Sequence, residues 1–183
     1  AQSHSFAVLP VRDRAFVRLI VTTLLRRLGQ IDTVLGHCLD RPLPPRAAVV
    51  RDVLRIGAVQ LLFLRVPPHA AVSTSVSILG CRRAAYRALV NAVLRRLARE
   101  GAALLAATDA ERVNLPAWLW RSWTAAYGEP ATRAIARMLM TAPPLDITVK
   151  REPEIWARRL DARLLPTGTL RRGAGVRPSS RAW

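Results

Sequence analysis

RALVNAVLRRLAREG, residues 87–101, carries the clearest helical pattern in the sequence. With the residue before it, the segment has apolar side chains every three or four positions: Tyr86, Leu89, Val90, Val93, Leu94 and Leu97. The arginines lie off that stripe: Arg87, Arg95, Arg96 and Arg99. An apolar face opposite a basic face is typical of a helix that packs on a core. Residues 84–99 are therefore predicted to form an amphipathic helix, with Gly101 in the C-terminal capping position.

The segments before residue 84 repeat this periodicity. Helices are predicted at 11–28, 30–39, 46–64 and 69–80. Gly29 indicates a stop or kink, and the proline pairs at 44–45 and 67–68 end helices, because proline lacks a backbone donor. Gly57 costs its helix roughly 1 kcal/mol relative to alanine, so we expect another helix to cross closely there. The fold class predicted for residues 11–101 is all-α, an antiparallel helical bundle.

The pattern changes after residue 101. A linker near 101–113, helical in its first half, precedes helices at about 114–128 and 130–140, a strand at 143–150 and a helix at 152–160. We interpret 114–172 as a helical linker and the incomplete start of a small α/β domain, and 173–183 as an unstructured tail. Trp118, Trp120 and Trp123 are expected to pack one domain against the next, in preference to stacking on unpaired bases.

The charge balance points to a polyanionic partner. The formal net charge is +17, from 29 basic and 12 acidic residues, and only Lys150 is a lysine. Such an excess raises the local concentration of polyanions, and the planar guanidinium suits bidentate phosphate contacts. Coding bias in a GC-rich genome explains the preference for arginine equally well, but it does not remove the charge. We therefore expect a nucleic acid partner.

The sequence offers no evident chemistry of its own. Cys38 and Cys81 lack metal-ligand or disulfide spacing, and no phosphate-binding loop or Ser-His-Asp arrangement occurs, so we expect no catalytic, cofactor-binding or metal-binding residues. The most apolar stretch, 56–64, is far shorter than the roughly 20 residues that cross a bilayer. With no signal-peptide pattern at the N-terminus, we expect a cytoplasmic protein without a membrane partner.

Three segments, in order, resemble the NusB-like N-terminal domain of bacterial 16S ribosomal RNA (cytosine-5) methyltransferases. They are DRAFVRLIVTTLLRRLGQID (13–32), IGAVQLLFLRVPPHAAV (56–72) and RALVNAVLRRLAREG (87–101). The similarity continues through the Pro-Trp-Leu helix at 116–128 and the Pro-Pro-Leu strand at 143–149. The resemblance implies a NusB-like bundle that binds structured ribosomal RNA, with a ribosomal protein as a possible further partner. It also implies S-adenosylmethionine as the cofactor of a methyltransferase domain that is absent from these residues.

The chain departs from this family in three respects. The NusB-like fold normally has an additional helix before 13–16, so one wall of the bundle is expected to be missing. VSTSVS (72–77) lacks the acidic residue that many relatives have there. The Gly-rich cofactor loop is absent, and the surroundings of Cys38 and Cys81 differ from those of the catalytic cysteines, so neither receives that role and the chain alone is expected to be inactive.

The candidate RNA-binding residues are arginines expected to form one basic strip across the bundle: Arg26, Arg27, Arg82, Arg83, Arg87, Arg95, Arg96 and Arg99. The alternative is a solvated helix face. Asn91 and Gln60, polar positions within apolar stripes, are interpreted as hydrogen-bonded structural residues.

Three functions follow from these observations. The leading hypothesis is the RNA-binding N-terminal part of an S-adenosylmethionine-dependent ribosomal RNA methyltransferase. The second is a stand-alone NusB-type antitermination factor, which would not need 114–172. The third is a truncated product without activity.

Overall fold

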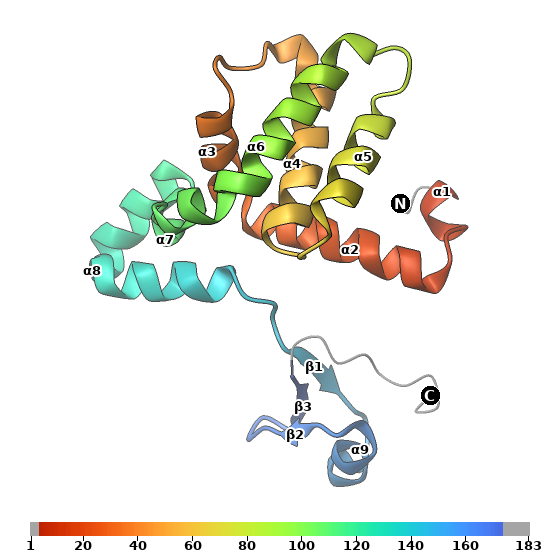
Figure 1. The fold of residues 1–183 in the computed structure, drawn as a ribbon. Helices are drawn as coiled ribbons and strands as arrows, with labels where there is room; N and C mark the ends of the chain where they lie inside the picture. Colours follow the sequence, from red (N-terminus) through yellow and green to blue (C-terminus); the bar gives the residue numbers. More distant parts are fainter. Residues whose placement is uncertain (1–3, 174–183) are drawn as a thin grey trace. The chain divides into compact units, whose positions relative to one another are not determined.

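The computed structural model describes residues 4–173, and the chain divides after Met140 into a helical unit and a C-terminal unit (Figure 1). This division differs from the expected one, in which the helices after residue 114 belonged with the strand segment. The short helix α7 (Ala110–Val113) contacts both α3 (Leu28–Cys38) and α8 (Ala117–Leu139), and these contacts place α7 and α8 in the helical unit.

The helical unit is built around four neighbouring helices. They are α3, α4 (Ala48–Leu62), α5 (Pro68–Ile78) and α6 (Arg87–Ala106), and short 3-10 turns, η1 (Pro45–Ala47) and η2 (Ala84–Tyr86), lead into α4 and α6. α2 (Val11–Arg26) crosses one end of this group and contacts α3 and α4 (Figure 1). The four-residue α1 (His4–Ala7) precedes it. The all-α bundle predicted from the sequence is confirmed.

The core lies where α6 meets α3, α4 and α5. Its most deeply buried side chains include residues of α3, α4 and α6: Ile31, Val34, Val50, Leu54, Val59, Val90, Leu94 and Leu97. Each fully buried Val or Leu side chain contributes roughly 1.5–3 kcal/mol relative to exposure. This burial fixes which side of α6 faces the core, and therefore which side its arginines occupy.

Three glycines were singled out from the sequence, and one of those interpretations is confirmed. A Cβ on Gly57 would lie 2.6 Å from Leu94 Cδ1 and 2.9 Å from Ser75 Oγ, so α6 and α5 do cross closely there. Gly29 is neither a stop nor a kink, because it lies inside α3, where its missing Cβ admits the carbonyl group of Val113. Gly101 is not a cap: it is buried inside α6, against Leu62.

The helices at the two edges of the unit are less regular. α2 has no buried residue, and Val11, Leu19 and Leu25 are 63%, 49% and 64% exposed, so this helix presents apolar side chains to solvent. α8 consists of two arms that change direction at Gly128, whose φ is 79° and ψ 162°. The two predicted helices at 114–128 and 130–140 correspond to these arms.

The C-terminal unit is a small antiparallel sheet with one helix. β1 (Leu145–Thr148) and β2 (Arg163–Leu164) flank β3 (Thr169–Arg172), and α9 (Pro153–Leu160) contacts β2 and β3. In the β1–β3 register Asp146 lies opposite Arg171, and their side chains form two hydrogen bonds of 2.7 and 2.8 Å. The sequence predicted the first strand and the helix but missed β2 and β3. Residues 174–183, most of the predicted tail, lie outside the described residues.

Candidate RNA interface

A groove of about 790 Å³ runs between α5 and α6. One wall is formed by residues on one face of α5: Pro68, His69, Val72, Ser73, Val76 and Ser77. The other wall follows α6: Arg87, Asn91, Arg95, Ala98 and Arg99. Since Arg87, Asn91, Arg95 and Arg99 are four residues apart, they form one ridge along the helix. No carboxylate side chain lines the groove, so its charge is positive.

The three groove arginines are exposed and largely available to a ligand. Arg95 donates from Nε to Asn91 Oδ1 at 3.2 Å, which leaves its terminal nitrogens uncommitted. Arg99 donates to the backbone carbonyl of Arg95 at 3.4 Å and lies 3.8 Å from Glu100, with a side chain 68% exposed. Within residues 4–173, Arg87 has no ion pair or side-chain hydrogen bond. Anions approaching the groove would therefore meet guanidinium groups that few carboxylates neutralise.

The other predicted arginines do not join this ridge. Arg96, one residue beyond Arg95, does not line the groove. Its Nε donates to Glu100 Oε2 at 2.9 Å, and this ion-paired hydrogen bond raises the pKa of Arg96. Arg82 and Arg83 lie in the turn between α5 and η2, near the start of α6. Of the eight arginines that the sequence predicted to form one strip, Arg87, Arg95 and Arg99 line the groove.

Arg26 and Arg27 lie at the junction of α2 and α3, apart from the groove. Arg26 lines a small hollow with residues of α8. Arg27 donates to Gln30 Oε1 at 3.0 Å, and its guanidinium carbon lies 5.6 Å from the centre of the Phe63 ring. Burial lowers the pKa of Arg27. These contacts indicate a structural role for Arg27.

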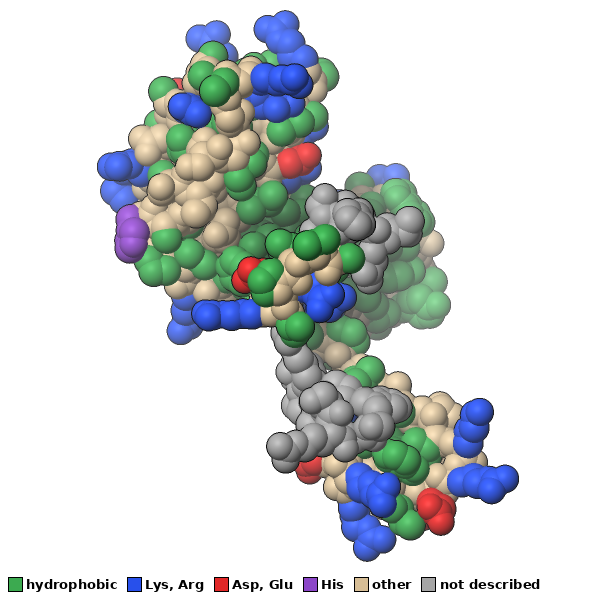
Figure 2. Space-filling model, turned by 90° about the vertical axis from the view of Figure 1, so that its right-hand side faces the viewer, with side chains coloured by type: hydrophobic (Ala, Val, Ile, Leu, Met, Phe, Trp, Pro, Cys, Tyr) green, Lys and Arg blue, Asp and Glu red, His purple; other side chains and the backbone are tan. Residues whose placement is uncertain are grey.

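The positive side chains are also distributed elsewhere on the surface. Figure 2 shows Lys and Arg side chains at several separate places on one face of the helical unit, with apolar and neutral areas between them. Local arrangement, not total charge, therefore distinguishes the groove.

Asn91 is hydrogen-bonded, as the sequence predicted, because its Oδ1 accepts from Arg95 Nε at 3.2 Å. Its side chain is only partly buried and lines the groove beside Arg95, a position that the sequence analysis did not assign to it. The four-residue spacing through 87, 91, 95 and 99 was the signal that could have placed it. Gln60, in contrast, is buried and donates to the carbonyl of Ile56 at 3.3 Å, so its structural interpretation is confirmed.

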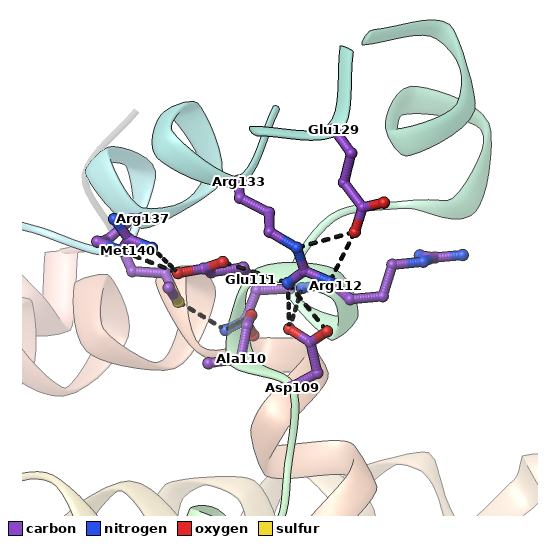
Figure 3. A network of polar contacts seen from close by, with 9 residues as sticks. Asp109, Ala110, Glu111, Arg112, Glu129, Arg133, Arg137 and Met140 are labelled. Atoms are coloured by element: carbon purple, nitrogen blue, oxygen red, sulfur yellow. Dashed lines mark hydrogen bonds and ion pairs between the residues drawn. The ribbon is translucent and has the colours of Figure 1, made fainter. Parts of the chain in front are cut away.

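A second polar cluster joins α7 to the second arm of α8 (Figure 3). Arg133 lies within 3.1 Å of Asp109, 3.3 Å of Glu111 and 2.9 Å of Glu129, and Arg137 pairs with Glu111 at 2.6 Å. The hydrogen bond from Arg137 outweighs desolvation and holds the pKa of Glu111 below its ordinary value. Because each arginine of the cluster is paired with a carboxylate, we interpret the cluster as structural: it holds the second arm of α8 against α7.

The tryptophans of α8 differ in their surroundings. The guanidinium carbons of Arg112 and Arg133 lie 5.1 and 5.3 Å from the centre of the Trp120 ring, so Trp120 packs within the helical unit. Trp118 is 64% exposed.

The described residues offer no metal-binding cluster, and their two cysteines differ in exposure. Between residues 4 and 173 no three His, Cys, Asp or Glu side chains gather in a way that could hold a metal ion. Cys38 is buried, which raises the pKa of its thiol, and Cys81 is exposed. None of the helices in this part of the chain is both long enough and apolar enough to span a membrane.

Comparison with known proteins places this arrangement in a family. Residues 2–99 match the sequence profile of the NusB family. Three similar proteins are named ribosomal RNA small subunit methyltransferase B. The one from Xanthomonas campestris is 38% identical over 135 residues, 72% of this chain and 30% of that protein. The one from Thermus thermophilus is 40% identical over 149 residues, which are 80% of this chain and 34% of that protein. The one from Escherichia coli is 31% identical over 157 residues, which are 82% of this chain and 36% of that protein. The chain thus spans about a third of the length of these relatives.

Proposed function

Because the chain belongs to the NusB family, we propose that its helical unit binds RNA and that the α5–α6 groove is the contact surface. The observation that carries this proposal is the row of three exposed arginines on α6 in a groove without a carboxylate. Guanidinium groups bind phosphate oxygens through short, charge-assisted hydrogen bonds. A groove with one sign of charge also attracts a polyanion before contact is made.

We propose small-subunit ribosomal RNA as the target. The relatives are named for methylation of that RNA, and their alignments of 135 to 157 residues are longer than the NusB match at 2–99. This extra similarity favours a methyltransferase over a stand-alone antitermination factor. The proposed role is to hold ribosomal RNA for a methyl-transfer domain, acting in the cytoplasm.

In this proposal, methyl transfer is carried out by a part of the relatives' sequence that lies outside the third matched by this chain. The resemblance implies transfer of a methyl group from S-adenosylmethionine to carbon 5 of a cytosine. Residues 4–173 do not fit that cofactor, because no strand among them is followed by the glycine-rich loop that the resemblance implies, and Val149, Lys150 and Arg151 follow β1. No methyl-transfer step is therefore assigned to these residues.

Fluorescence anisotropy with a labelled hairpin from small-subunit ribosomal RNA tests the binding proposal. A hydrogen bond to a charged group contributes about 1.5–3 kcal/mol, so the Arg95→Gln/Arg99→Gln double variant should bind at least about tenfold more weakly. The matched control is Arg46→Gln/Arg121→Gln, which removes the same charge from exposed positions outside the groove. Equal weakening by both double variants would contradict the groove as the contact surface.

A further inference from the structure

The two walls of the α5–α6 groove differ in charge. All three of its arginines belong to α6, whereas the α5 wall contributes proline, valine, serine and one histidine. From Arg87 to Arg99 the ridge extends about 18 Å at 1.5 Å per residue. One row of cations matches one phosphate backbone. A duplex carries two backbones, and its second backbone would find no arginine on the α5 wall.

The groove also has apolar surface that only an unpaired base can use. Pro68 and Ala98 are exposed, and Val76 is partly buried, all within the groove lining. In an A-form duplex the base faces are stacked and the deep major groove excludes side chains, whereas unpaired bases can turn outward and make contact. The volume of about 790 Å³ lies in the range of pockets that enclose a small molecule, so unpaired bases fit inside the groove, whereas a duplex could only lie across its opening.

Asn91 adds a polar group between the cations. Its Oδ1 accepts the hydrogen bond from Arg95, so its side-chain nitrogen keeps two hydrogens to donate. Asn91 lies between Arg87 and Arg95 in the ridge, where a base edge would pass between two phosphate contacts. Acceptor atoms on base edges are the natural partners of such a donor.

From this asymmetry we infer that the groove binds an unpaired RNA segment, with its phosphates along α6 and its bases against α5. The inference rests on the proposed RNA-binding function and specifies the form of RNA. Within a structured ribosomal RNA, the segment would be a loop, bulge or single-stranded end. Asn91 is the residue assigned to contact a base, and Arg87, Arg95 and Arg99 contact phosphates.

The test compares three probes on the 183-residue chain by fluorescence anisotropy. They are a single-stranded oligoribonucleotide, the same strand in a perfect duplex, and an abasic oligomer with the same number of phosphates. Three phosphate contacts on a single strand give a slope of log K against log salt of about −2, and Arg95→Gln should make it less negative by about 0.7. We expect the duplex and the abasic oligomer to bind roughly fivefold to tenfold more weakly, since neither offers a base face to the apolar wall.

Each outcome has a distinct meaning. Duplex binding as tight as single-strand binding overturns the inference, while RNA binding by the groove stands. Abasic binding as tight as that of the intact strand overturns the base contacts. Asn91→Ala should weaken binding of the intact strand more than binding of the abasic oligomer, because both probes lose the hydrogen bond that holds Arg95 but only the intact strand loses a base contact; equal effects on both would refute its role. If no probe binds in a manner sensitive to Arg95→Gln/Arg99→Gln, the proposed function itself fails.

Discussion

Replacing Gly29 with alanine should loosen the contact between α3 and α7. The new Cβ would overlap the carbonyl group of Val113 and approach the backbone nitrogen of Asn114 to 3.0 Å. A backbone cannot rotate away as a side chain can, so α7 has to move. That movement breaks two hydrogen bonds, from the Gln30 N–H to Asn114 Oδ1 at 3.0 Å and from Asn114 Nδ2 to Gln30 Oε1 at 2.9 Å.

The expected loss of stability follows from these contacts. Two hydrogen bonds contribute about 1 kcal/mol each, and overpacking costs about 1–3 kcal/mol. Alanine improves helix propensity by about 1 kcal/mol, so the free energy of unfolding should fall by about 2–4 kcal/mol.

Urea unfolding measures this change with two probes, far-ultraviolet circular dichroism for all helices and tryptophan fluorescence, which the three tryptophans of α8 dominate within the helical unit. The matched control is Gly36→Ala in the same helix, where nothing lies within 4 Å of the new Cβ. That variant should gain up to about 1 kcal/mol. If Gly29→Ala proves as stable as Gly36→Ala, the close approach of α3 and α7 does not constrain position 29 and the reasoning is refuted.

Three further predictions concern packing, acid and thiol access. Gly57→Ala should lower the free energy of unfolding by about 1–2 kcal/mol in the same urea assay, because its Cβ meets two neighbouring helices; an unchanged midpoint would contradict this. Burial would raise the pKa of Asp109, but the hydrogen bonds that its carboxylate accepts lower this pKa below its ordinary value, and the pKa of Glu111 is lowered as well. The two ionised carboxylates therefore stabilise the folded chain fully above about pH 4.5, and this stabilisation should be lost as the pH falls through their lower folded-state pKa values. Thermal melts between pH 6 and 3 measure it, and a melting temperature that does not fall with acid would count against it. Ellman's reagent should modify Cys81 rapidly and Cys38 only at the rate of unfolding; equal rates would show that Cys38 is accessible.

Much of the fold could be predicted because its helices are locally encoded. Apolar periodicity located the bundle helices, and Gly57 signalled a close crossing before any contact was known. The end of α6 was predicted too early, because Gly101 was interpreted as a cap, whereas its missing Cβ leaves space for Leu62 to pack against the continuing helix. β2 and β3 were missed for another reason: strands of two and four residues are too short to show alternation, although Pro166 and Gly168 marked the turn between them.

The site was predicted in composition more than in place. Sequence spacing identified the arginines of α6, but the direction of each depended on its neighbours in space. Arg96 is adjacent to Arg95 in the chain yet lies about 100° further around the helix, where Glu100 reaches it. The sequence could not predict that α5 forms the neutral second wall of the groove, because local sequence patterns do not determine which helix packs beside α6.

The bend at Gly128 gives α8 a direction that side-chain packing need not supply. Its φ and ψ lie in a region almost closed to other residues, and Pro130, two positions on, cannot donate the N–H that a straight helix would require there. The backbone at Gly128 and Pro130 therefore determines the angle between the two arms. Gly128→Ala would introduce strain, and Pro130 would still prevent one continuous helix. Because the bend depends on these two positions, substitutions elsewhere on α8 can change its surface without changing its direction.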